Sequence, residues 1–234
     1  SLAIGAAVLA TKRLAPDRSV SSFDNIYLGT CYDRSDIIKE VRNQKIHEQF
    51  KVKENWTVDE LATKICNGSI AARFSGNMEF GQRALGNRSI LADPRHYETI
   101  DKINTQIKNR DFWMPFALSI LKEKQKFCII NKKKLSSPFM TVGFNVNKKN
   151  FEYLKNGCHK HDQTVRPQIV DKMNCPDFHK LINEFYKLTN VPALLNTSFN
   201  LHGNPVVHDL KDAIKTFDNC ELKYLLINDF LIQK

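Results

Sequence analysis

The stretch Arg73–Arg95, which reads RFSGNMEFGQRALGNRSILADPR, decides how the rest of the chain is interpreted. Glycine allows positive φ and lets a ligand approach the backbone closely. Arginine offers a rigid fork of donors that matches phosphate or carboxylate oxygens. The stretch therefore predicts an anion-binding loop between strands at 70–74 and 89–92. The alternative is a turn-rich connector whose arginines pair with the nearby acids Glu79 and Asp93. The arginines and glycines concerned are Arg73, Arg83, Arg88, Arg95, Gly76, Gly81 and Gly86.

The composition of the 234 residues, 42% hydrophobic and 26% charged, is typical of a globular protein with one large or two small domains. The net charge of +10 favours an anionic partner such as nucleic acid, acidic lipid or a phosphorylated small molecule. Part of that charge lies in lysine runs at 122–126 and 132–134, which are more simply solvated surface. The six cysteines contain no Cys-x-x-Cys pair, which argues against structural zinc and suits a reducing, cytoplasmic location. No apolar run approaches the roughly 18 residues of a membrane span.

The spacing of apolar residues predicts an α/β protein with a sheet of mixed direction. Thr57 and Glu60 predict a capping box, Pro176 suits the first position of a helix, and Asp209 is expected to cap another. The expected helices lie before Pro16, at 36–41, 57–68, 98–108 and 176–188, and after Asp209. The expected strands lie at 70–74, 89–92, 116–121, 139–146, 191–195, 222–227 and 229–232.

Further polar segments share the character of the opening stretch. Lys108 and Arg110 follow a predicted helix, where they could bind one anion or complement the helix dipole. The segment 159–168, HKHDQTVRPQ, is a polar turn leading into a strand or, because two histidines lie near an aspartate, a weak metal signal. The segment 196–200, NTSFN, directly follows an expected strand and supplies donors for a phosphate or nucleotide, or is an ordinary turn.

Taken together, the segments MEFGQRALGNRSILADPR, INTQIKNRDFWMPFA, SPFM, DQTVRPQ, VPALLNTSFNLHGNPVV and DAIKTF resemble the C-terminal half of the NodU/CmcH-type O-carbamoyltransferases. The resemblance covers essentially all 234 residues. It implies a YrdC-like fold, an open twisted mixed α/β sheet with helices packed on it and a basic concave face. It also implies that residues 1–28 are the last helix and linker of a preceding hexokinase/actin-like domain, and that residues 29–234 form the YrdC-like domain.

The resemblance further implies that this domain forms carbamoyl adenylate from carbamoyl phosphate and ATP with Mg²⁺, for transfer to a hydroxyl acceptor. Iron is expected only in the preceding domain, and no metal site is expected here. Three positions depart from the family pattern, namely Gln82, Met114 and Asn204. The catalytic residues that the resemblance assigns are Arg83, Lys108, Arg166 and Ser198. The residues assigned to the nucleotide are Arg88, Arg110, Thr164, Asn196 and Asn200.

The competing hypothesis is a basic YrdC-like module that binds RNA or nucleotides and has no transferase activity. The arginines and lysines of the motifs lie in glycine turns and at strand ends, not along one face with interleaved aromatics. Nucleic acid and membrane are therefore not the expected partners. A homodimer is compatible with the sequence.

Overall fold

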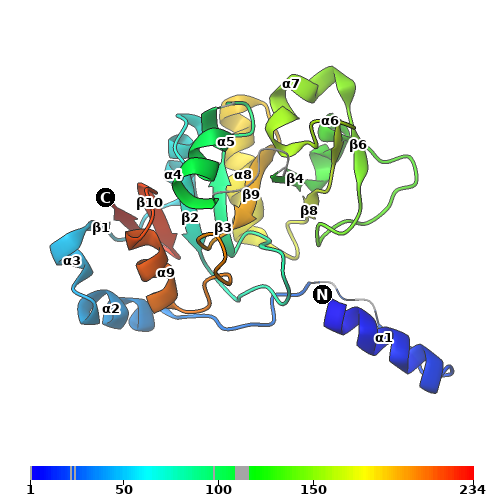
Figure 1. Ribbon diagram of the computed structural model, residues 1–234, viewed down its shortest axis with the longest axis horizontal. Coiled ribbons are helices and arrows are strands. Elements are labelled where there is room, and N and C mark those ends of the chain that lie inside the picture. The colour runs from blue at the N-terminus through cyan, green and yellow to red at the C-terminus, as the bar shows by residue number, and fades with distance from the viewer. Residues whose placement is uncertain (1, 22, 24, 97, 109–115) are drawn as a thin grey trace.

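A computed structural model defines residues 2–21, 23, 25–96, 98–108 and 116–234. Eight strands form one sheet: β1 (Lys51–Lys53), β2 (Ala71–Phe74), β3 (Arg88–Ala92), β4 (Ala117–Leu121), β8 (Gln168–Val170), β9 (Ala193–Ser198), β10 (Tyr224–Ile227) and β11 (Phe230–Gln233). Their order is β1-β11-β10-β2-β3-β9-β4-β8 (Figure 1). The pairs β10–β2 and β4–β8 are parallel and the others are antiparallel, which confirms the expected sheet of mixed direction.

A smaller antiparallel sheet contains β5 (Ile129–Ile130), β6 (Phe144–Val146) and β7 (Thr164–Val165). The short helices α6 (Gln125–Cys128) and α7 (Phe151–Leu154) accompany it. The strand expected over 139–146 was wrong in its first half, because Met140 has the left-handed φ of 56° and lies in a turn. The short strands β1, β5 and β7 were not predicted, whereas β8 is the strand into which the polar turn at 159–168 was expected to lead.

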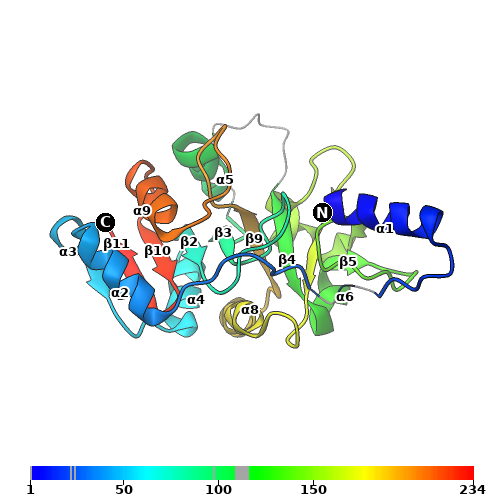
Figure 2. The same ribbon diagram turned by 90° about the horizontal axis from the view of Figure 1, so that it is seen from below.

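Helices cover both faces of the large sheet (Figure 2). The larger ones are α1 (Leu2–Leu14), α2 (Arg34–Asn43), α4 (Val58–Cys66), α5 (Glu98–Ile103), α8 (Pro176–Thr189) and α9 (Leu210–Asp218), with a single turn at α3 (Ile46–Gln49). Figure 2 shows α4 and α8 on one face and α5 and α9 on the other. The caps agree with the sequence: Thr57 and Glu60 form the capping box, Pro176 opens α8, and Asp209 accepts a hydrogen bond at the start of α9. No described helix has the length and apolarity needed to cross a bilayer.

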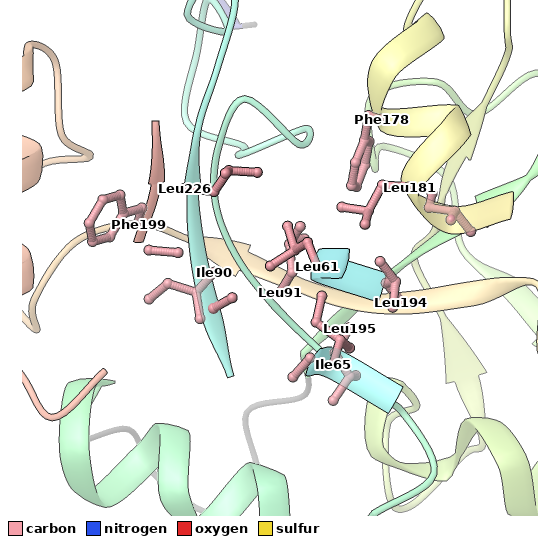
Figure 3. Close-up of a cluster of buried hydrophobic side chains, with 14 of the residues drawn as sticks. Leu61, Ile65, Ile90, Leu91, Phe178, Leu181, Leu194, Leu195, Phe199 and Leu226 are labelled. Atoms are coloured by element: carbon pink, nitrogen blue, oxygen red, sulfur yellow. The ribbon is translucent and has the colours of Figure 1, made fainter. Parts of the chain in front are cut away.

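The core lies between α4, α8 and the central strands (Figure 3). Leu61 and Ile65 from α4 and Leu181 from α8 pack over the central strands, near the strand residues Leu91 and Leu194, and all five side chains are fully buried. Burying one such side chain contributes about 1.5–3 kcal/mol. The strands that carry the site are therefore packed tightly on one face against α4 and α8.

The helix expected over 98–108 changes its geometry before it ends. The α-helical part stops at Ile103, and Asn104–Lys108 continues as a π-helical turn. Such wide turns in a helix are often found at functional sites. Here the turn ends at Lys108, whose side chain is only 2% exposed.

The first helix lies at the edge of the molecule, and the segment that follows it is paired with the body. Helix α1 has no buried residue, but its Ile4 packs against the cluster of Ile26, Leu85 and Met140 (Figure 1). Residues 26–30 then run along the glycine-rich loop: Gly29 N–H donates to the Met78 carbonyl at 2.9 Å, and Phe80 N–H donates to the Ile26 carbonyl at 2.7 Å. The domain boundary expected after residue 28 lies inside this paired segment.

Candidate active site

The glycine-rich loop is organised around the carboxylate of Glu79. Its Oε1 accepts hydrogen bonds from the backbone N–H groups of Leu85 and Asn87, both at 2.7 Å, and of Arg88 at 3.2 Å. Glu79 is buried, and a carboxylate that accepts several backbone N–H groups fixes the chain around it. Glu79 thus holds the turn that leads into β3 and does not pair with an arginine of the loop.

Gly86 is a position of the loop where no other residue type fits. Its φ is +114°, and a Cβ at this position would lie 2.4 Å from Cδ1 of Phe178. Its carbonyl oxygen accepts a hydrogen bond from Arg73 Nη1 at 2.6 Å. The glycine therefore lets the loop lie directly on α8.

Arg73 and Arg88 are buried in the scaffold. The Arg88 guanidinium lies 3.6 Å from the centre of the Phe74 ring, and burial lowers the pKa of Arg88 to about 10. Burial also lowers the pKa of Arg73. The structure places Arg88, predicted to bind the nucleotide, on backbone oxygens and does not bring it to the cavity described below. The carbonyls that accept its hydrogen bonds, at 3.0–3.2 Å, are those of Thr30, Ser75, Gly76 and Asn87.

Arg95 pairs with a nearby acid, as expected if the loop is a turn-rich connector. Its Nη2 lies 2.6 Å from Oδ2 of Asp93, and its Nε lies 3.0 Å from both oxygens of that carboxylate. The hydrogen bonds that Arg95 donates to Asp93 raise the pKa of Arg95. The pair Arg95–Asp93 was the alternative left open for this loop, and for this arginine it is the arrangement found.

Arg83 is directed differently from the other three arginines. It is exposed and lines a cavity of about 620 Å³ together with Arg166 and Thr164, which come from β7 and the turn after it. Within the described part of the chain, neither Arg83 nor Arg166 makes a hydrogen bond or an ion pair. Two unpaired guanidinium groups on one cavity are suited to bind a phosphate or carboxylate. The other walls come from Phe116, Ala117, Met140, Gly143, Gly157, His159, Asp162 and Val165.

His159 was noted in the sequence only as part of a weak metal signal, and the structure places it on this cavity. Asp162 Oδ1 accepts hydrogen bonds from the Thr164 N–H at 2.9 Å and its hydroxyl at 2.8 Å, and lies 3.2 Å from His159 Nδ1. The bonds from Thr164 lower the pKa of Asp162. An ionised Asp162 therefore orients both the histidine and the threonine at the cavity wall. Among the described residues, no three His, Cys, Asp or Glu side chains gather as metal ligands.

Lys108, Ser198 and Asn200 form a second cluster at the end of β9. The Lys108 ammonium lies 2.5 Å from the Ser198 carbonyl oxygen and 3.2 Å from its hydroxyl. It also lies 2.9 Å from the Asn200 carbonyl oxygen and 2.6 Å from its side-chain oxygen. The structure thus joins three of the predicted site residues although Lys108 is 90 residues away in sequence.

Asn196 belongs to a buried hydrogen-bonded chain that the sequence did not reveal. Asn196 Nδ2 donates to Ser119 Oγ at 2.9 Å, and Ser119 Oγ donates to Gln168 Oε1 at 2.8 Å. Gln168 Nε2 donates to the Leu85 carbonyl at 2.8 Å and lies 3.3 Å from the Tyr27 hydroxyl. Asn196 was predicted as a site residue and Gln168 closes the motif DQTVRPQ, but nothing in the sequence indicated that the two are linked through Ser119. The chain ties β9, β4 and β8 to the glycine-rich loop.

The sheet register connects these clusters. Asn196 on β9 pairs with Ala117 on β4, and Ala117 lines the cavity. Ser198 lies two residues further along β9 and pairs with Ser89. The cavity and the Lys108 cluster are therefore neighbours along one strand. Arg110 and Met114, on which further expectations depended, lie outside the described residues.

A larger hollow of about 970 Å³ lies elsewhere, over residues 122–138 and β8. It contains none of the predicted site residues. Its Lys122 is paired with Asp171 and its Glu123 with His179. The smaller cavity, with its two unpaired arginines, is the better candidate for an anion site.

Residues 62–234 match the family model described as "Carbamoyltransferase C-terminus", and the chain belongs to this family. It is 40% identical over 182 residues to nodulation protein NolO of Bradyrhizobium diazoefficiens, covering 75% of this chain and 33% of that protein. It is 28% identical over 176 residues to 3'-hydroxymethylcephem-O-carbamoyltransferase of Amycolatopsis lactamdurans, covering 75% of this chain and 33% of that enzyme. The chain spans less than half the length of the curated relatives that it matches.

Solved structures show the same fold. A crystal structure of full-length HypF in a phosphate- and nucleotide-bound form has a TM-score of 0.54 at 17% identity, covering 95% of this chain and 34% of that one. A structure of a variant of Sua5 from P. abyssi has a TM-score of 0.50 at 14% identity, covering 76% of this chain and 50% of that one. The expected YrdC-like α/β fold is confirmed.

Proposed function

We propose that this chain is the carbamoyl-activating part of an O-carbamoyltransferase, which forms carbamoyl adenylate from carbamoyl phosphate and ATP. The observation that carries the proposal is the cavity on which Arg83 and Arg166 meet, both without an ion pair in the described chain. The two arginines come from segments more than eighty residues apart in sequence. Membership in the carbamoyltransferase family names the group that is transferred.

The chemistry requires such a site because both substrates are polyanions. The net reaction takes carbamoyl phosphate, ATP and one water to carbamoyl adenylate, pyrophosphate and phosphate. Water cleaves the bond between the carbamoyl group and its phosphate, which releases phosphate and leaves carbamate. An oxygen of the carbamate then bonds the α-phosphorus of ATP as the Pα–O bond to pyrophosphate breaks. Positioning and charge stabilisation dominate phosphoryl chemistry. Arg83 and Arg166 would bind phosphate oxygens and stabilise the charge of the leaving group.

The second cluster supports the same reaction from the end of β9. Lys108 holds Ser198 and Asn200 in one arrangement through its hydrogen bonds. Ser198 would position a phosphate or carbamoyl oxygen, and Thr164 would serve the nucleotide from the cavity wall. ATP would bring Mg²⁺. The described residues offer no ligand cluster for iron, so no step of this proposal runs through iron.

The test supplies the purified chain with ATP and labelled carbamoyl phosphate and measures pyrophosphate and labelled adenylate. We expect pyrophosphate release that depends on carbamoyl phosphate. ATP without carbamoyl phosphate is the control. Pyrophosphate release that ignores carbamoyl phosphate would contradict the proposal.

Acceptor transfer is a separate part of the proposal. The activation groups described here are cations and hydrogen-bond donors, whereas an acceptor hydroxyl needs its own pocket and an activating group. We therefore expect no carbamoylated product when a panel of hydroxyl compounds is added to this chain alone. Acceptor-dependent product at an enzymatic rate would place the transfer site within these residues.

A second candidate function is binding of RNA by the lysine-rich part of the fold. Residues 122–166 hold eleven lysines and arginines against three acids, so most of the net charge lies there. RNA binding through many phosphates weakens steeply with salt. Affinity for an RNA duplex that collapses between low and moderate salt, with no nucleotide-dependent chemistry, would favour this candidate over the enzyme.

A further inference from the structure

We propose that Asn196 recognises the amino group of the carbamoyl moiety through its side-chain oxygen. The inference rests on the proposed function, because it assumes that the site handles a carbamoyl group. It goes further by naming the atom that distinguishes this group from other acyl groups.

The orientation of the Asn196 amide is fixed by a backbone carbonyl three hydrogen bonds away. The Leu85 carbonyl oxygen can only accept, so the group of Gln168 that lies 2.8 Å from it must be the donor Nε2. Gln168 Oε1 then faces Ser119, whose hydroxyl proton it accepts at 2.8 Å. Because that proton is used, Ser119 Oγ accepts from Asn196, and the atom of Asn196 beside it is Nδ2.

Tyr27 reinforces this direction. Its hydroxyl donates to the same Leu85 carbonyl at 2.9 Å. A reversed Gln168 amide would place its oxygen against the Leu85 carbonyl oxygen, and two acceptors repel at that distance. The whole chain of hydrogen bonds therefore has one stable direction, with donors that point from Asn196 toward the loop.

The consequence is that Asn196 presents an acceptor at the free end of the chain. Its Oδ1 is inaccessible to solvent and has no hydrogen-bond partner within the described chain. Buried acceptors without a partner are uncommon in folded proteins, and each one calls for a specific explanation. A ligand that donates a hydrogen bond would satisfy it.

The position of Asn196 relates this acceptor to the cavity. Asn196 pairs across the sheet with Ala117, and paired residues project on the same face. Ala117 is part of the wall that also carries Arg83 and Arg166, whereas Asn196 is buried beside Ala117 and is not itself part of that wall. A bound carbamoyl group would therefore reach the Asn196 oxygen only where the wall beside Ala117 opens. The arginines are donors suited to phosphate oxygens, whereas the Asn196 oxygen would repel a phosphate.

The carbamoyl group has the complementary pattern. Its NH₂ group supplies two donors, and its neighbouring phosphate supplies only acceptors. Acetyl phosphate has the same phosphate and nearly the same shape but carries CH₃ in place of NH₂. A site built to hydrogen-bond an N–H discriminates against an analogue that lacks it, because the buried acceptor is then left unpaired.

The experiment compares the dissociation constants of carbamoyl phosphate and acetyl phosphate for the full chain by calorimetry. We expect wild type to prefer carbamoyl phosphate by about five- to tenfold, the range of one hydrogen bond. Asn196→Leu should abolish the preference and retain acetyl phosphate binding. Ser119→Ala should reduce the preference in part, because Asn196 then loses the partner that orients it.

Ser137→Ala is the matched control. Ser137 is also fully buried and donates to a backbone carbonyl, that of Pro167, at 2.9 Å, but it lies outside the chain of Asn196. The preference should stay at its wild-type value in this variant. An unchanged preference in Asn196→Leu that still binds both ligands would overturn this inference alone. Absence of carbamoyl phosphate binding to wild type would overturn the proposed function and this inference together.

Discussion

The side-chain nitrogen of Lys108 lies 2.6 Å from the side-chain oxygen of Asn200, a residue 92 positions further along the chain. The same nitrogen bonds the carbonyl oxygens of Ser198 and Asn200, so one buried cation gathers the end of β9 and the turn after it. Lys108 is the last residue of the π-helical turn that follows α5.

Lys108→Met tests that arrangement with a side chain of similar length. The variant leaves several oxygens without their charged donor in a buried setting, which should lower the free energy of unfolding by about 2–3 kcal/mol. Denaturation in urea measures it. The exposed Lys102 in α5, which forms an ion pair with Glu98, provides the control: Lys102→Met should change stability by about 0.5 kcal/mol or less.

Arg166→Ala should weaken use of carbamoyl phosphate or ATP by at least about tenfold, because a hydrogen bond to a charged group contributes roughly 1.5–3 kcal/mol. The fold should be intact, since Arg166 is exposed. Steady-state pyrophosphate release gives the rate, and circular dichroism checks the fold. Lys134→Ala, in the exposed lysine run, should behave as wild type. Wild-type kinetics in Arg166→Ala would remove Arg166 from the site.

Arg88 and Arg83 should separate into a structural and a binding arginine. Arg88→Met leaves four backbone carbonyls without their donor and should cost about 3 kcal/mol of stability. Arg83→Ala should change stability by about 0.5 kcal/mol or less and weaken ATP binding by about tenfold. Thermal unfolding and nucleotide titration measure the two effects. The opposite assignment, a stable Arg88→Met that no longer binds ATP, would return Arg88 to the ligand site.

Gly86→Ala should destabilise the protein by at least about 2 kcal/mol, because the new methyl group enters the ring of Phe178 at a positive φ. Gly203→Ala is the control for the strain alone: its φ is +78° and no atom lies within 4 Å of the added Cβ. That variant should lose only about 1 kcal/mol. Equal losses in the two variants would mean that Phe178 moves aside without cost.

The buried thiols predict a loss of stability in alkali. Burial raises the pKa of Cys158 to about 12, and it also raises the pKa of Cys128. Above about pH 8.5 the unfolded chain loses these protons while the folded chain keeps them. The unfolded state then binds fewer protons, so the free energy of unfolding falls as pH rises toward the folded pKa.

Urea unfolding at about pH 7.5 and about pH 9.5 measures this slope, which can reach about 1.4 kcal/mol per pH unit for each thiol. Cys158→Ala should reduce the slope. The exposed Cys31 provides the control, since Cys31→Ser should leave the slope unchanged. A stability that is flat over this pH range would contradict the prediction.

The sequence predicted the elements whose causes are local. The capping box of Thr57, the start of α8 at Pro176 and the buried strands of the sheet follow from residue type and spacing, and all are present. The strand over 139–146 was wrong in its first half because the turn at Met140 depends on packing against Ile26 and Leu85, which come from distant segments.

The sequence predicted which cationic residues belong to the candidate site. It did not predict which of them line the cavity and which are buried in the fold. Arg83 and Arg166 reach the cavity, whereas Arg88 turns into the scaffold, and nothing in the spacing of the loop distinguishes them. Which of them is buried depends on where Phe74 and residues 26–30 lie. The role of Ser119 was not predicted for a similar reason, because its hydrogen-bond partners are set by the register of β9 and β8 against β4.

The pairing of residues 26–30 with the glycine-rich loop has a consequence for chimeric proteins made from two members of this family. A chimera joined at residue 29 would combine a Tyr27 from one parent with the Leu85 carbonyl and Gln168 of another. A breakpoint within residues 15–21, where every residue is exposed, would take residues 26–30 and the glycine-rich loop from the same parent. Chimeras of two relatives should therefore keep the stability of their parents when the crossover falls before Ile26 and lose stability when it falls between Ile26 and the glycine-rich loop.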